Sequence, residues 1–222
     1  MLSIQTALSQ NAGIDSMLQK IAAEKNDNRR IDIMYSSLVI IGETNPVLGL
    51  KYAQKLLDYS QINKDKIGEA YAMSFTGKMY GVSGNIEKGL GYALKGKEIA
   101  EQTGNGKLLA MSTTFLGLIY KYLGNFAKSI SYYMASVQIA EKVNYQQAQV
   151  LGFQNLSEIY LTLNQFDSAL MYAQKEYELS LRIKYYDFFS YTLINLGAIH
   201  GKWGNPPVAL GYFDMSISES NK

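Results

Sequence analysis

Catalytic side chains are scarce in this sequence. His200 is the only histidine in 222 residues, and there is no cysteine. A serine nucleophile needs an adjacent base, and structural zinc sites are built mainly from thiolates and imidazoles. The chain has no G-x-S-x-G motif, and "GVSGN" and "GLGYALKGK" do not match a phosphate-binding P-loop. The sequence therefore predicts no catalytic residue, no metal site, no cofactor and no enzymatic activity.

The remaining charged residues are balanced. The chain has 21 basic and 19 acidic residues, a net charge of +2. This balance gives no reason to expect nucleic acid or an anionic membrane as partner. No apolar run of about 18 residues is present, so we expect no direct membrane insertion by this region. Glu176 and Glu178 are expected on solvated helix faces.

One segment recurs at a fixed step of 40 residues. The stretch "LGLIYKYLGNFAKS" (116–129) is followed by "LSEIYLTLNQFDSA" (156–169) and "LGAIHGKWGNPPVA" (196–209). The shared positions include Tyr80, Tyr120, Tyr160 and His200, so we interpret the histidine as a packing residue. A period between 20 and 50 residues is typical of stacked repeat architectures.

Each repeat is predicted to form two helices. In the third repeat, apolar residues recur at steps of three and four before and after "LGN" at 123–125. Gly124 can take the left-handed conformation that ends a helix, and Asn125 can cap the next helix. Small residues such as Gly117 and Ser129 allow the two helices to approach closely.

The wording "LGLIY…GNF…S…Y" resembles the tetratricopeptide repeat, in a long form with a 40-residue step in place of 34. The resemblance implies an all-α, right-handed superhelical solenoid of about five helical hairpins. Residues 1–27 are predicted to be an N-terminal capping helix, centred on 14–25, and residues 28–222 the solenoid. The expected units are about 28–64, 65–104, 105–144, 145–184 and 185–222.

In the tetratricopeptide family the first helix of each hairpin lines a concave groove. Transferring these positions gives a predicted groove of Tyr71, Ser74, Lys78, Met111, Thr114, Leu118, Lys121, Tyr122, Leu151, Gln154, Asn155, Glu158, Thr162, Tyr191, Ile194, Asn195, Ala198 and Lys202.

Eight of these positions form the predicted ligand-binding set. They are Lys78, Lys121, Tyr122, Gln154, Asn155, Glu158, Tyr191 and Asn195. Asn155 and Asn195 lie 40 residues apart and so occupy equivalent places on neighbouring hairpins. An amide both donates and accepts hydrogen bonds, so the pair can bind the backbone of an extended peptide without reading its sequence.

These features favour a non-catalytic protein- or peptide-binding module. One hypothesis is the sensory or scaffold region of a bacterial sensor histidine kinase, because the repeats and the segment "DSMLQKIAAEKNDNRRIDIMYSSL" resemble repeat regions of that family. The region would then be periplasmic. The alternative is a free-standing cytoplasmic peptide receptor or adaptor.

The last predicted helix, "PVALGYFDMSISES", places Leu210, Phe213 and Ile217 on one stripe. Such a stripe facing water is unusual in a monomer. We therefore expect either that the native chain continues past Lys222 or that this face pairs with another chain, with self-association through this helix as one possibility.

Overall fold

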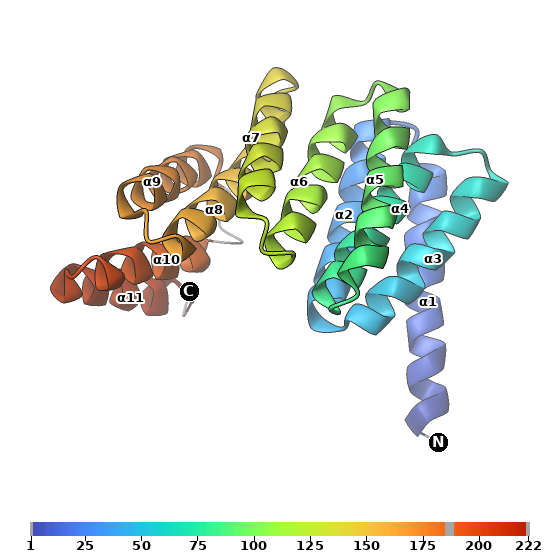
Figure 1. The fold of residues 1–222 in the computed structure, drawn as a ribbon. Helices are drawn as coiled ribbons and strands as arrows, with labels where there is room; N and C mark the ends of the chain where they lie inside the picture. The colour runs from blue at the N-terminus through green and yellow to red at the C-terminus, as the bar shows by residue number, and fades with distance from the viewer. Residues whose placement is uncertain (1, 185–188, 221–222) are drawn as a thin grey trace. The chain divides into compact units, whose positions relative to one another are not determined.

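Every element in the described part of the chain is an α-helix, which confirms the all-α prediction (Figure 1). The computed structural model describes residues 2–184 and 189–220. Its helices are α1 (Leu2–Ala23), α2 (Asp27–Thr44), α3 (Pro46–Ile62), α4 (Lys66–Val82), α5 (Ile86–Thr103), α6 (Gly106–Tyr122), α7 (Phe126–Lys142), α8 (Gln146–Thr162), α9 (Phe166–Ile183), α10 (Phe189–Lys202) and α11 (Pro206–Ser220).

A left-handed residue recurs every 20 residues and sets the repeat. Positive φ angles occur at Gly84, Gly104, Gly124 and Gly204, and at the non-glycine residues Lys64, Asn144, Asn164 and Lys184. The glycines adopt this conformation without steric cost, as predicted for Gly124. Most helices between these turns are 17 or 18 residues long, for example α4 and α5. Two such helices and their turns account for the 40-residue step.

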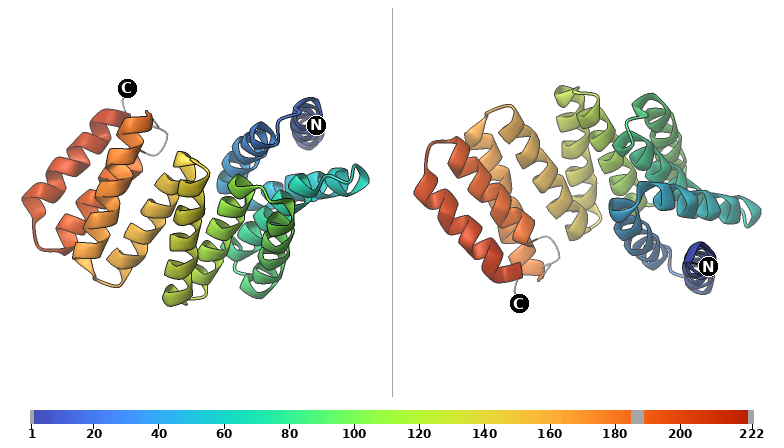
Figure 2. Two further views of the ribbon diagram at one scale, coloured as in Figure 1. Left: turned by 90° about the horizontal axis from the view of Figure 1, so that it is seen from above. Right: turned by 90° about the horizontal axis from the view of Figure 1, so that it is seen from below.

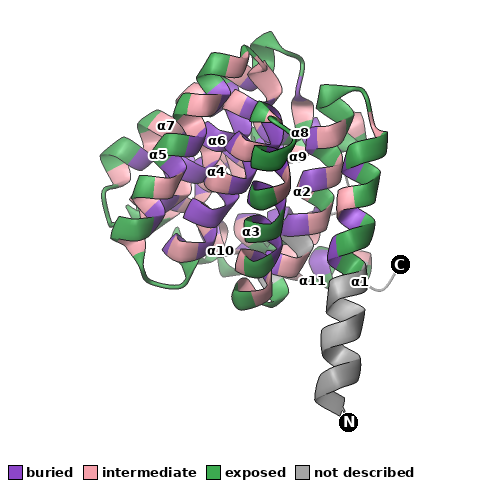
Figure 3. Ribbon diagram, turned by 90° about the vertical axis from the view of Figure 1, so that its right-hand side faces the viewer, coloured by how far each residue is buried: buried purple, intermediate pink, exposed green. Residues whose placement is uncertain are grey.

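The chain divides into two compact units. The first, Met1–Asn125, contains α1 to α6, and the second, Phe126–Lys222, contains α7 to α11. In the first unit α4 packs against α2, α3, α5 and α6, and most of its residues are buried (Figure 3). In the second unit α8 packs against α7 and α9, and α10 packs against α9 and α11. Both views of Figure 2 show α8 and α9, and α10 and α11, as helical pairs.

Small residues bring paired helices into backbone contact, as the sequence predicts. A Cβ added to Gly77 of α4 would lie 2.7 Å from the backbone N of Ala93 and 2.7 Å from the backbone O of Gly89, both on α5. In the second unit the hydroxyl of Ser157 on α8 donates to the carbonyl of Ala169 on α9 (2.9 Å). A small residue therefore stands at each of these two helix crossings.

The N-terminal helix is longer than predicted. It begins at Leu2 rather than near residue 14 and ends at Ala23. Its residues Ile14, Met17 and Ile21 are buried, at a spacing of three and four that makes one apolar stripe. The stripe packs in the first unit, where α1 contacts α2 and α3.

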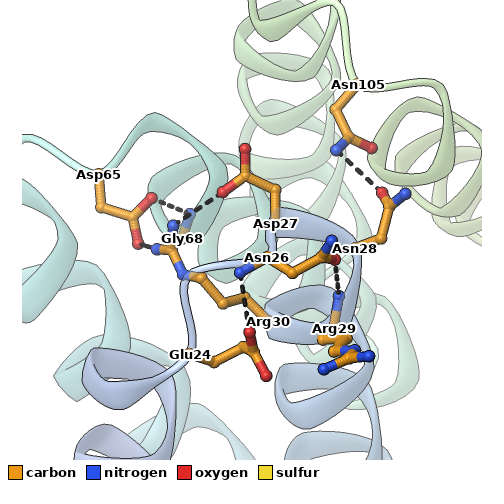
Figure 4. A network of polar contacts seen from close by, with 9 residues as sticks. All are labelled: Glu24, Asn26, Asp27, Asn28, Arg29, Arg30, Asp65, Gly68 and Asn105. Carbon is orange, nitrogen blue, oxygen red and sulfur yellow. Dashed lines mark hydrogen bonds and ion pairs between the residues drawn. The ribbon is translucent and has the colours of Figure 1, made fainter.

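The helix N-termini of the first unit are joined by polar contacts (Figure 4). Asp65 caps α4 by accepting from Gly68 N (3.1 Å), and the guanidinium of Arg30 is paired with both Asp65 and Asp27. Asn105, which caps α6, donates from its amide to Asn28 Oδ1 of α2 (3.1 Å). A cavity of about 600 Å³ adjoins this network. Because its contacts join the ends of α2, α4 and α6 within the first unit, we interpret the network as structural.

Candidate functional site

The eight predicted ligand-binding residues fall in both units. Lys78, Lys121 and Tyr122 lie on α4 and α6 of the first unit, and the other five lie on α8 and α10 of the second unit. The two groups therefore form two separate candidate surfaces.

The first-unit surface is more closed than predicted. Tyr71, Ser74 and Met111, predicted to line a groove, are buried. The Tyr71 ring lies 6.4 Å from that of Phe75, and the Ser74 hydroxyl donates to Ser112 (2.9 Å). The prediction of solvent-lining roles for these three residues is wrong, because α2 packs against both α4 and α6 and helps to bury these helices.

The predicted cation of this surface packs on aromatic rings. The ammonium of Lys78 lies 5.8 Å from the centre of the Phe75 ring and 5.7 Å from that of Phe115, within cation–π range. Lys121 is half-buried and Tyr122 is exposed. The first unit thus offers one exposed aromatic residue beside two half-buried lysines.

The second-unit surface is built by α8 and α10, and we name it the amide face. Its residues are Gln154, Asn155 and Glu158 on α8, and Tyr191, Ile194 and Asn195 on α10. The α8 residues and Asn195 are half-buried, whereas Tyr191 is 61% exposed and Ile194 46% exposed. An exposed aromatic and an exposed aliphatic side chain therefore flank three amides and a carboxylate.

The two asparagines bond differently although they are equivalent in the repeat. Asn155 Nδ2 donates to the carbonyl of Leu151, one turn earlier in the same helix (2.7 Å). Asn195 Nδ2 donates to Ser157 Oγ of α8 (2.8 Å), so it joins the two helices. This bond places the Asn195 amide against α8, the helix that carries Asn155. Each of these two bonds uses one N–H, and an amide has a second N–H and a carbonyl oxygen to offer.

A carboxyl group that was predicted from the sequence to be solvated is buried beside this face. Glu176 of α9 is 0% exposed, so the prediction that it is solvated is wrong. The Thr192 hydroxyl of α10 donates to Glu176 Oε1 (2.6 Å), and Oε2 is buried with no hydrogen-bond partner. Burial raises the pKa of Glu176 to about 8; the Thr192 hydrogen bond opposes that rise and the nearby Glu158 charge adds to it.

The repeat register contains a signal for the burial of Glu176. At the step of 40 its counterparts are Leu56, Gly96, Ser136 and Ser216, all uncharged and all buried. A glutamate in a register of uncharged residues that pack in the core predicts a buried carboxyl.

His200 contacts aromatic rings. Its ring lies 5.6 Å from that of Tyr212 and 6.5 Å from that of Trp203. The equivalent pairs Tyr80–Tyr92 and Tyr160–Tyr172 lie at 5.6 and 5.5 Å. The histidine thus occupies the place of a packing tyrosine, in line with the interpretation from its register.

Two further properties concern metals and membranes. Among the described residues, no group of three or more His, Cys, Asp and Glu side chains is arranged to hold a metal ion. In the same part of the chain, none of the helices has the length and apolar character needed to cross a membrane.

Comparison with known proteins identifies the repeat. The family model described as tetratricopeptide repeat matches residues 108–182. No curated protein matches the sequence.

Three solved structures share the fold. BtubC from P. vanneervenii is 15% identical, with 96% of this chain and 89% of that chain covered and a TM-score of 0.68. A Rap protein complexed with Competence and Sporulation Factor is 16% identical, with 99% and 62% covered and a TM-score of 0.71. A STAND protein with a tetratricopeptide repeat sensor, from Pyrococcus horikoshii, is 18% identical, with 99% and 35% covered and a TM-score of 0.67.

These likenesses show the fold, a tetratricopeptide-like solenoid, and confirm that part of the prediction. The chain spans less than two thirds of the Rap and STAND chains that it matches.

Proposed function

Because residues 108–182 are tetratricopeptide repeats, we propose that this chain is a non-catalytic module that binds an extended protein segment or peptide on the amide face of α8 and α10. The observation that supports the proposal is that Asn155 and Asn195 are half-buried on α8 and α10, two helices that the bond from Asn195 to Ser157 joins. Two amides on adjacent first helices can pair with the N–H and C=O groups of an extended backbone.

The amides alone hold no ligand, because each such bond contributes only about 0.5–1.5 kcal/mol net. Apolar contacts must supply the rest, and aromatic residues are favoured anchors in interfaces. Tyr191 and Ile194 are exposed beside Asn195 on α10 and are suited to this role. Glu158 and Gln154 add polar contacts on α8. By analogy, Lys78, Lys121 and Tyr122 form a second, smaller contact surface in the first unit.

We further infer a role in signal transduction. The likeness to a Rap protein solved with Competence and Sporulation Factor, and to a STAND protein with a tetratricopeptide repeat sensor, supports this inference. Within it, the sensory or scaffold region of a bacterial two-component histidine kinase is our first candidate. A free-standing peptide receptor or adaptor is the second, and the Rap likeness favours it. The full-length gene distinguishes these two candidates. A membrane helix and a kinase domain encoded downstream identify the histidine kinase region.

The binding test uses a library of unstructured peptides displayed on phage, selected against the intact chain. The double substitution Asn155→Ala with Asn195→Ala should lower the affinity for the selected peptides by about 5- to 100-fold, because two or more hydrogen bonds are lost. Asn195→Ala also removes the bond to Ser157. We therefore expect a lower thermal midpoint, by about 2–4 °C per kcal/mol lost.

The matched control is Ser157→Ala. It breaks the same bond between α10 and α8 from the other side, and also the bond from Ser157 to the Ala169 carbonyl, while the Asn195 amide remains. Peptide affinity should stay within about twofold of the parent. If Ser157→Ala weakens binding as much as the asparagine substitutions, the amides act through packing and the proposed contact is refuted. If selected peptides bind the double variant as tightly as the parent, the amide face is not the site.

A further inference from the structure

Three hydrogen bonds join α8, α9 and α10 of the second unit to one another. Asn195 of α10 donates to Ser157 of α8 (2.8 Å), and Ser157 donates to the Ala169 carbonyl of α9 (2.9 Å). The third bond runs from the Thr192 hydroxyl of α10 to Glu176 Oε1 of α9 (2.6 Å). Of these three bonds, only the third includes a group that can change its charge. It is therefore the bond through which pH can act on the three helices.

The surroundings of the Glu176 carboxyl favour its neutral form. The residue is 0% exposed, and Oε2 is buried with no hydrogen-bond partner. A carboxylate has about four acceptor sites, and the Thr192 hydroxyl fills one of them. A buried charge without enough partners is far more costly than a buried neutral acid. Ionisation of Glu176 therefore requires water at Oε2, and water reaches this buried atom only if the helices around it move apart.

The helices packed against α9 bring no positive charge close to Glu176. In the described part of the second unit these helices are α8 and α10, and their titratable residues are Glu158, Tyr160, Tyr191, His200 and Lys202. The charge of Glu158 adds to the rise in the pKa of Glu176. His200 and Lys202 lie more than two turns beyond Thr192, at least about 12 Å along α10.

On α9 itself, the nearest charged side chains lie in solvent. Lys175 is exposed, and its ammonium lies 5.9 Å from the centre of the Phe153 ring and 5.3 Å from that of Tyr172. Glu178 is exposed as well. Solvent screens charges in such positions. Within α8, α9 and α10, which the structure describes in full, the carboxyl of Glu176 thus has no cation buried beside it.

The start of α10 also carries half of the amide face. Thr192 and Asn195 are three residues apart on this helix, so their side chains are neighbours on its surface. The exposed Tyr191 and Ile194 precede them directly. A movement of the start of α10 away from α9 therefore displaces all the α10 residues that we assign to ligand binding.

We propose that Glu176 is a positioning residue for the amide face, and that its ionisation loosens residues 189–195 of α10 from α9 and weakens ligand binding. The protonated carboxyl holds the start of α10 in place, and the carboxylate releases it. Because burial, as the largest cause, raises the pKa of Glu176 to about 8, the change falls at mildly alkaline pH. The inference rests on the proposed function for its ligand, whereas the loosening of α10 is a property of the chain alone.

The first measurement needs no ligand. Hydrogen exchange followed by mass spectrometry compares the parent with Glu176→Gln at about pH 6.5 and about pH 9.5. The substitution lies on α9, so residues 189–195 have the same intrinsic exchange rates in both proteins at each pH. The ratio of their exchange rates, parent over variant, should rise at least about fivefold between the two pH values. An equal rise in α7 would mean that the whole second unit opens, and would refute a local loosening of α10.

The second measurement is isothermal titration calorimetry with a peptide selected against the intact chain. The peptide has blocked ends and no residue that titrates in this pH range. Its Kd for the parent should rise at least about fivefold from about pH 6.5 to about pH 9.5, and one proton allows at most about tenfold per pH unit. For Glu176→Gln the two Kd values should be nearly equal.

Two further variants test the role of the carboxyl. Glu178→Gln, at an exposed position of α9, should show the same pH dependence of Kd as the parent. Thr192→Val should move the midpoint of the change to higher pH, because the hydrogen bond from Thr192 favours the ionised carboxyl and opposes the rise in its pKa. A bond with a purely structural role would not move the midpoint.

The outcomes separate this inference from the proposed function. If no peptide is selected at about pH 6.5, the proposed function fails, and the ligand part of the inference fails with it. If peptides bind the parent equally well at both pH values, or if Glu176→Gln keeps the pH dependence of the parent, the inference is overturned while the proposed function stands. Circular dichroism at both pH values checks that each protein stays folded.

Discussion

The buried carboxyl of Glu176 should make the stability of the second unit depend on pH. In the folded chain its pKa is raised from 4.5 to about 8, chiefly because burial disfavours the charged form. Between these two values the folded state binds a proton that the unfolded state has released. Stability must then fall as pH rises through this window, and this group adds no further change above about pH 8.

The size of the effect follows from the shift. Each pH unit inside the window changes the free energy of unfolding by about 1.4 kcal/mol, so the whole shift corresponds to about 5 kcal/mol. Glu176→Gln keeps the shape of the side chain and its acceptor for the Thr192 hydroxyl, but it has no charge at any pH. At pH 5 the variant and the parent should differ little. At pH 8 the variant should be more stable by several kcal/mol.

The measurement is urea unfolding followed by circular dichroism at pH 5, 6, 7 and 8, with the difference between parent and variant taken at each pH. The exposed Glu178, two residues further along α9, supplies the control Glu178→Gln. Its difference from the parent should stay nearly constant over the same range. Parallel curves for Glu176→Gln and the parent would refute the reasoning, since the carboxyl would then have the same pKa folded and unfolded.

Two other substitutions test the packing. Gly77→Ala places a Cβ 2.7 Å from backbone atoms of α5 and should lower the free energy of unfolding by about 1–3 kcal/mol, whereas Gly91→Ala, with nothing within 4 Å, should raise it by about 0.5–1 kcal/mol; urea unfolding compares them. His200→Phe keeps the ring contacts with Tyr212 and Trp203 and should shift the thermal midpoint by only a few degrees, whereas His200→Ala loses ring contacts of about 0.5–1.5 kcal/mol each.

The helices and their spacing could be predicted because the same residue pattern recurs in each repeat. Gly84, Gly124 and Gly204 adopt left-handed conformations, and glycine at these positions predicts such turns. Lys64 and Lys184 adopt the same conformation without glycine, and nothing in their side chains predicts it. There the conformation follows from the backbone bonds that close the helix, such as Asp65 N to Ser60 O (2.7 Å). The period locates these turns, but the residue type does not.

The candidate site could be predicted only in part, because its chemistry depends on contacts between repeats. Tyr71 and Met111 occupy groove positions in the family alignment, yet the packing of α2 against α4 and α6 closes that region in the first unit. Asn155 and Asn195 are equivalent in sequence, but only Asn195 has the Ser157 hydroxyl of the preceding first helix within reach. The residue pattern within one repeat does not show which side chains of the neighbouring repeat will contact it.

Departures from the repeat register are therefore the most informative positions in this chain. Glu176 stands where other repeats have Leu, Gly or Ser, and its carboxyl is buried at the contact between α9 and α10. Asp214 stands where α9 has Gln174, on a face that α11 leaves exposed. Packing alone favours neither acid, since burial penalises the first and the second lies between exposed apolar residues. Glu176 thus identifies a place where pH can act on a fold that otherwise repeats itself.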